Sequence, residues 1–163
     1  MKQIYFSRHA KSSWGDLTLM DIDRPLNKRG LRDAPIMADK LAQRCNSIDL
    51  LISSPAKRTK ITRTYFEKTI SHKKTLIDDK IYEATVDRIL EVIHDLDDQY
   101  ESALLFGHNP AFTYVYNLFS QEAIENLPTS GLFGLTSQVD SWSSVDSTNS
   151  DIDFLIYPKM FIS

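Results

Sequence analysis

Cysteine is almost absent from this sequence, which has one, Cys45, among 163 residues. A single thiol excludes an internal disulfide. Long apolar runs are absent as well: no stretch is long enough to span a bilayer. Met1 and Lys2 lead directly into a predicted strand rather than into a signal peptide. We therefore expect a cytoplasmic protein that makes no membrane contact.

The sequence also lacks an excess of basic residues and a metal-binding motif. Its net charge of −3 provides no basic surface, so nucleic acid is not an expected partner. No metal-ligand spacing connects its four histidines, of which His72 and His94 are expected to be exposed. We expect neither a metal nor another cofactor. The length of 163 residues and the hydrophobic content of 42% suit a single domain over residues 1–163.

The first apolar segment ends in a pair of residues with chemical potential. Ile4 to Phe6 predicts a buried strand, and Arg8 and His9 follow at its carboxyl end. Ligands of open α/β sheets bind beyond this end of the strands. Arginine binds phosphate or carboxylate through a planar fork of donors, and histidine can be a neutral nucleophile near pH 7. Alone, the pair is equally compatible with a solvated arginine beside a core histidine.

Two more predicted strands end in polar residues. The apolar segment Leu50 to Ile52 runs into a Ser-Pro turn that opens a helix, and Ser54, Arg58 and Thr62 recur every four residues on one face of it. The spacing alone does not decide whether Arg58 faces a site or the solvent.

The third segment, Ala103 to Phe106, leads into Gly107-His108, with Asn109 expected to cap the next helix and Pro110 expected in its first position. A second histidine therefore follows a strand.

Taken together and in this order, the segments resemble the histidine phosphatase superfamily, and within it the small phosphohistidine phosphatases of the SixA type. The resemblance extends over about residues 1–135. The matching segments are Arg8-His9-Ala10, Arg24 to Gly30, Ser54 to Thr62, Gly107 to Pro110 and Asn126 to Thr129. Most members of the family have glycine where this sequence has Ala10, a departure of one methyl group.

The resemblance implies a role for each matching residue. His9 would be the nucleophile that becomes transiently phosphorylated, and Arg8, Arg58 and His108 would surround the phosphoryl oxygens. No metal is required for this chemistry, because positioning and charge stabilise a loose phosphoryl transition state.

Three further residues are candidates for contact with the substrate. Lys11 and Ser12 are candidates because they lie closest to His9 in sequence. Glu83 resembles the proton donor of the mutase and phosphatase branches of the family, although members of the SixA type can lack this acid. An ordinary acidic residue ahead of a helix, stabilised by the helix dipole, is the alternative for Glu83.

The expected fold is a three-layer α/β/α sandwich of the phosphoglycerate mutase type, with a mostly parallel sheet and an antiparallel edge. The edge pair is predicted from Leu132 to Leu135 and from Phe154 to Tyr157, joined by a mobile connection over Asp140 to Asp151. A helix capped by Asn27 is expected to kink or to begin late because of Pro35.

The expected function is a phosphatase that acts on phosphohistidine in a protein, by transfer to His9 and attack of water. The alternative is a small-metabolite phosphomonoesterase, for which Glu83 would matter most because an alkoxide leaves badly without a proton. An alternative of another class is a catalytically silent phosphate-binding module. The short chain between Thr62 and Gly107 leaves little room for a lid, so we expect a shallow, water-exposed pocket.

Overall fold

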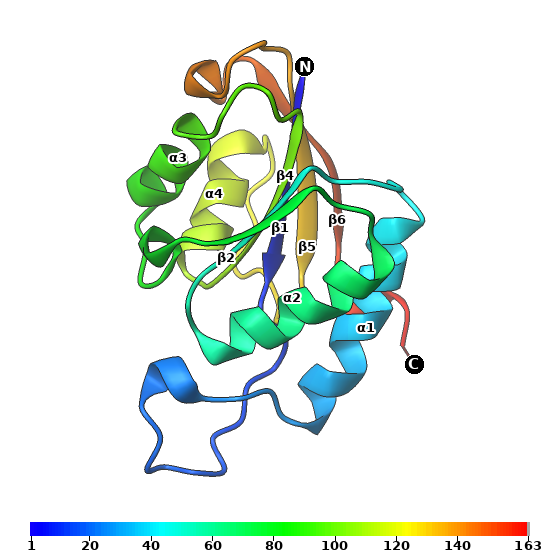
Figure 1. Cartoon of the computed structure of the whole chain (residues 1–163), viewed down its shortest axis with the longest axis vertical. Coiled ribbons are helices and arrows are strands. Elements are labelled where there is room, and N and C mark those ends of the chain that lie inside the picture. The colour runs from blue at the N-terminus through cyan, green and yellow to red at the C-terminus, as the bar shows by residue number, and fades with distance from the viewer. Residues whose placement is uncertain (163) are drawn as a thin grey trace.

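The structure, a computed structural model, describes residues 1–162, which form a six-stranded sheet with helices on both faces (Figure 1). The strands are β1 (Lys2–Arg8), β2 (Leu50–Ser53), β3 (Lys74–Ile77), β4 (Ser102–Gly107), β5 (Leu132–Ser137) and β6 (Ser150–Ile156). Their order is β3-β2-β4-β1-β5-β6. The first four pair in parallel, whereas β5 runs antiparallel to β1 and to β6. The predicted mostly parallel sheet with an antiparallel edge is confirmed.

Two helices cover each face of the sheet, as Figure 1 shows. The helices are α1 (Lys28–Ala42), α2 (Lys57–Thr69), α3 (Val86–His94) and α4 (Ala111–Phe119). Successive side chains of β1 alternate between the faces. Ile4 and Phe6 belong to the core cluster under α3 and α4, and Tyr5 belongs to the cluster under α1 and α2. The predicted three-layer sandwich is therefore confirmed.

The carboxyl ends of β1, β2 and β4 meet at one edge of the sheet. Arg8 pairs with Gly107, and Ser53 pairs with Phe106, in the parallel ladders. Both β2 and β4 are buried along their whole length, which explains their continuous apolar sequence. The residues that follow these strands consequently lie side by side.

The helix starts agree with the sequence in most details. The Asn27 side chain accepts a hydrogen bond from the amide of Gly30 at 2.9 Å, as a cap of α1 should. This helix begins at Lys28 and continues through Pro35, so the late start is wrong. The start of α4 lies one residue beyond the expected position, at Ala111.

The structure differs from the sequence-based expectation in two places. Strand β3, at the edge of the sheet, has only two apolar residues in succession and was not predicted. The segment expected to be mobile is anchored by Trp142, which is fully buried and donates its indole Nε1–H to the carbonyl of Tyr100 at 2.9 Å. One large aromatic side chain thus fixes a segment whose average composition is polar. No helix in residues 1–162 has both the length and the apolar character to cross a membrane.

Candidate active site

His9 is held by backbone hydrogen bonds on both sides. Its amide donates to the carbonyl of Gly107 at 3.0 Å, and its carbonyl accepts from the amide of Ser130 at 3.1 Å. The ring Nδ1 lies 2.7 Å from the carbonyl oxygen of Ala10. A carbonyl only accepts, so Nδ1 must carry the proton and Nε2 carries the free lone pair. Burial lowers the pKa of His9 to about 3, and the charges of His108, Arg58 and Arg8 act in the same direction.

His108 lies beside His9, with 5.3 Å between the ring centroids. Its Nε2 is 2.7 Å from the Ser54 hydroxyl, and its Nδ1 is 3.4 Å from Nη2 of Arg58. Burial first, and then Arg58, lower the pKa of His108 to about 3. A hydroxyl can donate or accept, so Ser54 supports either ring tautomer. His108 can therefore accept from Arg58 or donate from Nδ1 to an incoming oxygen.

The turn after β2 brings Ser54 to the site, and α2, which begins at Lys57, brings Arg58 and Thr62, so Ser54 precedes the helix instead of lying on its face. Ser54 contacts His108, Arg58 approaches it, and Thr62 supports the backbone next to His9. The Thr62 hydroxyl accepts from the amide of Ala10 at 3.0 Å and donates to the carbonyl of Arg58 at 2.8 Å. These contacts fix the end of β1 against the first turns of α2.

The two arginines present donors that other protein groups do not use. Arg8 donates from Nη1 to the carbonyl of Leu127 at 2.8 Å, but its Nε is buried without a hydrogen bond to any residue from 1 to 162. The same holds for Nε of Arg58. A buried donor without a partner costs about 1–3 kcal/mol and calls for an explanation. Together with the adjacent histidines, these donors can bind an anionic group.

Asp21, in the loop between β1 and α1, lies across this site. Its side-chain oxygen Oδ2 is 3.0 Å from Nη2 of Arg58 and accepts a hydrogen bond from the Tyr82 hydroxyl at 2.6 Å. Arg24 pairs with its other oxygen at 3.2 Å. The hydrogen bond from Tyr82, and then the guanidinium of Arg58, lower the pKa of Asp21 to about 2. The carboxylate is therefore ionised at neutral pH.

The expectation of a shallow, water-exposed pocket is wrong at His9. His9 is 7% exposed and Arg58 is 5% exposed. The covering chain is the loop before α1, and the stretch between α2 and β4, where no lid was expected, contributes Tyr82 to it. The three-residue spacing from Asp21 to Arg24 was a signal for their ion pair, but nothing in the sequence linked Tyr82 to either residue.

The two residues closest to His9 in sequence are used differently. Ser12 is buried, and its hydroxyl accepts from Nη1 of Arg24 at 2.9 Å. Arg24 also stacks on the ring of Trp14, with 3.6 Å from Cζ to the ring centroid. Ser12 thus helps to anchor the covering loop, whereas Lys11 lines an adjacent pocket.

Glu83 does not join the site through any direct contact. Its side chain is exposed, and it makes no hydrogen bond or ion pair with the residues from 1 to 162. Its backbone adopts the left-handed region, with φ of 53°. The neighbouring Tyr82, rather than Glu83, faces His108, at 5.5 Å between ring centroids.

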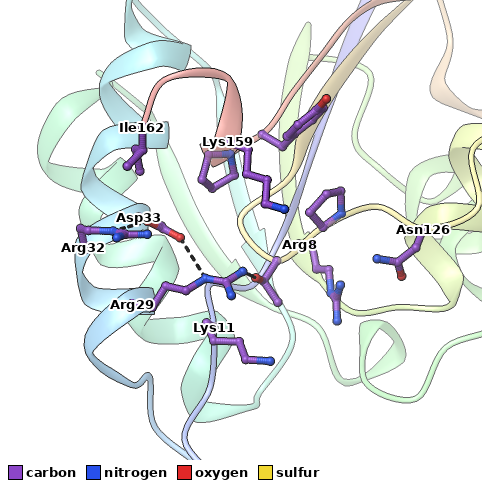
Figure 2. Close-up of a pocket in the computed structure, with 12 residues that line it drawn as sticks. Arg8, Lys11, Arg29, Arg32, Asp33, Asn126, Lys159 and Ile162 are labelled. Atoms are coloured by element: carbon purple, nitrogen blue, oxygen red, sulfur yellow. Dashed lines mark hydrogen bonds and ion pairs between the residues drawn. The ribbon is translucent and has the colours of Figure 1, made fainter.

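A pocket of about 810 Å³ is lined in part by Arg8 (Figure 2). We call it the basic pocket, because most of its charged side chains are cationic. It is lined by Arg8, Lys11, Arg29, Arg32, Asp33, Asn126, Pro128, Thr129, Tyr157, Pro158, Lys159 and Ile162. Within residues 1–162, no three His, Cys, Asp or Glu side chains come together as a potential metal site.

Buried histidines and arginines at the carboxyl edge of a three-layer α/β sandwich describe a protein built to hold an anionic group such as phosphate. Comparison with known proteins gives the family. Residues 4–84 match the family model of the histidine phosphatase superfamily (branch 1). An uncharacterised protein of Mycobacterium tuberculosis (strain ATCC 25618 / H37Rv) is 30% identical over 141 residues, covering 77% of this chain and 83% of that protein.

Two other similarities extend the comparison. An uncharacterised chloroplastic protein of Arabidopsis thaliana is 30% identical over 129 residues, and the aligned part covers 78% of this chain but only 51% of that longer protein. A solved structure from Agrobacterium tumefaciens, described as that of a candidate phosphohistidine phosphatase SixA, has a TM-score of 0.81 and 27% identity, covering 96% of this chain and 98% of that one. The chain belongs to the histidine phosphatase superfamily and is of the SixA type. Phosphatase activity is the functional class that this membership supports.

Proposed function

We propose that this protein removes the phosphoryl group from phosphohistidine in a protein, through a phosphohistidine intermediate on His9. The proposal takes Nε2 of His9 as the nucleophile, because Nδ1 is occupied by its hydrogen bond to the carbonyl of Ala10. Arg8, Arg58 and His108 bind the phosphoryl oxygens in it. The buried, unpartnered Nε donors of the two arginines support this role.

The choice of substrate rests on two carboxyl groups, the ionised one of Asp21 and the exposed one of Glu83. Asp21 contacts Arg58 but is ionised, since its pKa lies at about 2. Glu83 is exposed and makes no contact with either histidine. The site therefore offers no evident acid to protonate an alkoxide. An imidazole leaves without such help when its other ring nitrogen is protonated, because the unperturbed pKa of imidazolium is only about 6.5. Phosphohistidine therefore fits this site better than a phosphate ester does.

The proposed reaction has two steps. The lone pair of His9 Nε2 attacks phosphorus and the bond from phosphorus to the substrate nitrogen breaks. Its electron pair returns to the substrate ring, whose other nitrogen already carries a proton, so that neutral imidazole leaves. Water then attacks phosphorus, the bond to Nε2 breaks with its pair returning to His9, and the water proton passes to solvent as inorganic phosphate leaves. Arginine donors aimed at the phosphoryl oxygens stabilise the charge in both transition states.

A comparison of substrates tests the proposal. We expect kcat/KM for a phosphohistidine-bearing protein to exceed that for any small phosphate ester by at least about a hundredfold, roughly 2.7 kcal/mol of transition-state binding. Steady-state kinetics on both substrate types measures the ratio. An ester that matches the phosphoprotein would favour the small-metabolite phosphomonoesterase, and binding without turnover of any substrate would favour the silent phosphate-binding module.

A further inference from the structure

The basic pocket concentrates positive charge on a protein of the opposite sign. Five of its side chains are cationic and one is acidic, whereas the whole chain has a net charge of −3. The cations are Arg8, Lys11, Arg29, Arg32 and Lys159. Like charges repel, so folding stability alone gives no reason to gather them. An anionic ligand would explain why these cations lie together.

Two arginines of the pocket are oriented by other protein groups but keep exposed donors. The buried carboxylate of Asp33 pairs with Nε of Arg32 at 2.8 Å and with Nε of Arg29 at 3.6 Å. Arg29 also donates to the Thr129 hydroxyl at 3.3 Å. The side chains of Arg29 and Arg32 nevertheless remain 53% and 54% exposed. Their outer donors are therefore oriented and available to a ligand.

The lysines approach the same space from other elements. Lys11 lies just beyond β1, and Lys159 lies in the short 3₁₀ turn Pro158–Met160 after β6. Neither side chain makes an ion pair with the residues that the structure describes. Figure 2 shows Lys11, Arg29 and Lys159 around the space beside Arg8. Close packing fixes the backbone of Lys11 against α1, because a Cβ at Gly30 would collide with the carbonyl oxygen of Lys11.

The size and lining of the pocket indicate what it accepts. Its volume of about 810 Å³ is in the range of sites that enclose drug-sized ligands and is far more than one phosphate group needs. Pro128, Pro158 and Ile162 add apolar surface to the lining. A short acidic peptide segment, which carries carboxylates on aliphatic stems, fits such a mixed lining.

We propose that the basic pocket binds an acidic segment of the phosphorylated protein, close in space to the phosphohistidine presented to His9. This inference rests on the proposed function, because Arg8 belongs to both the pocket and the phosphate site. The binding residues are exposed, so the attraction acts mainly on encounter and on KM, and it weakens as salt increases. The basic pocket thus recognises the substrate protein, whereas the chemical step takes place at His9.

Binding of an unphosphorylated probe tests the pocket without turnover. The probes are a fluorescent hexaglutamate peptide and its hexaglutamine counterpart, measured by anisotropy at low salt. Lys159→Glu is compared with Lys74→Glu, which makes the same charge change at the amino end of β3, on the opposite edge of the sheet. We expect wild type to prefer hexaglutamate, Lys159→Glu to weaken it about tenfold, and Lys74→Glu to retain it. Equal weakening by both variants would overturn the proposal.

Turnover then links the pocket to the substrate. For a phosphohistidine peptide with acidic flanks we expect Lys159→Glu to raise KM about tenfold at unchanged kcat, and to leave turnover of phosphoramidate unchanged. A fall in phosphoramidate turnover would instead mean a disturbed histidine site and would count against the pocket. A second result would also count against it: if inorganic pyrophosphate displaced hexaglutamate and bound the pocket with the higher affinity, the ligand would be a small polyanion and not a peptide.

The two proposals can fail separately. Lysine-dependent binding of hexaglutamate without turnover of any phosphohistidine substrate would keep the acidic-peptide site and reject the proposed function. Turnover of phosphohistidine that neither flanking acids nor Lys159→Glu alters would keep the function and reject the pocket.

Discussion

The histidine site and the basic pocket share Arg8 but differ in their exposure to water. His9, Arg58 and His108 are almost completely buried, whereas Arg29 and Arg32 are more than half exposed. Charge interactions are strong where water is excluded, and they are weak, screened and longer in reach at the surface. The difference suggests a division of labour, with bond making in the buried part and partner selection in the exposed part.

The sharpest test of the buried part is His9→Ala. We expect it to abolish turnover and the phosphoenzyme, because no other nucleophile lies at the end of β1. Acid-labile phosphate on the protein, trapped by rapid quench, is the measurement. His72→Ala, which changes a histidine away from the site, should leave both signals intact. Phosphoenzyme on the His9→Ala protein would show that another residue is the nucleophile, and it would contradict the assignment of bond making to His9.

Arg58→Ala is expected to have the next largest effect. Loss of a buried, oriented charged donor should reduce kcat/KM by about 2 to 4 kcal/mol of transition-state stabilisation. Lys57→Ala, one residue earlier on the exposed side of α2, is the matched control and should stay within a small factor of wild type. Near-wild-type kinetics for Arg58→Ala would show that its buried charge serves the fold rather than the reaction.

Burial of the two histidines should also make stability depend on pH. The folded-state pKa values of His9 and His108, at about 3, lie below the unfolded value of 6.5. The unfolded chain therefore binds more protons between these limits, and stability is complete above pH 6.5 and decreases as the pH falls. From pH 7 to pH 5 we expect a loss of about 2 to 4 kcal/mol.

Urea unfolding at both pH values measures this loss. His9→Ala should reduce the difference between the two pH values by about half, since one of two buried histidines is removed. Lys159→Glu, in the exposed region, should leave the difference unchanged. A wild-type stability that is equal at pH 5 and pH 7 would contradict the burial argument for both rings.

The sequence was informative about the sheet and its strand ends and less informative about what covers them. Buried parallel strands read as apolar runs, so the positions of Arg8, His9 and His108 beyond β1 and β4 could be predicted. The edge strand β3 has only two apolar residues in succession, Leu76 and Ile77, which is too short a run to predict a strand. The basic pocket was not predicted either, because α1, the loop before β5 and the turn after β6 meet only in three dimensions.

Asp21 and Tyr82 show this limit most clearly. A carboxylate in a polar loop and a tyrosine before a helix each have an ordinary local explanation, and 61 residues separate them. Only the fold brings them together over Arg58. Long-range hydrogen bonds of this kind leave no periodicity in the sequence.

The smallest effect expected is that of Tyr82→Phe, which probes the boundary between the buried and exposed regions. The Tyr82 hydroxyl donates to the ionised Asp21 at 2.6 Å. Its removal should raise the pKa of Asp21 and lower the free energy of unfolding at pH 7 by about 1 kcal/mol, the usual net value of one hydrogen bond. Carbon-detected NMR titration of the Asp21 carboxyl and urea unfolding give the two values. Tyr114→Phe, at an exposed tyrosine of α4, is the control. If Tyr82→Phe leaves the Asp21 pKa unchanged, the two arginines, Arg58 and Arg24, hold the carboxylate without Tyr82. The covering loop would then be attached to the histidine site through the Arg58 guanidinium, which the substrate also needs, and phosphate binding would have to compete with Asp21 for it.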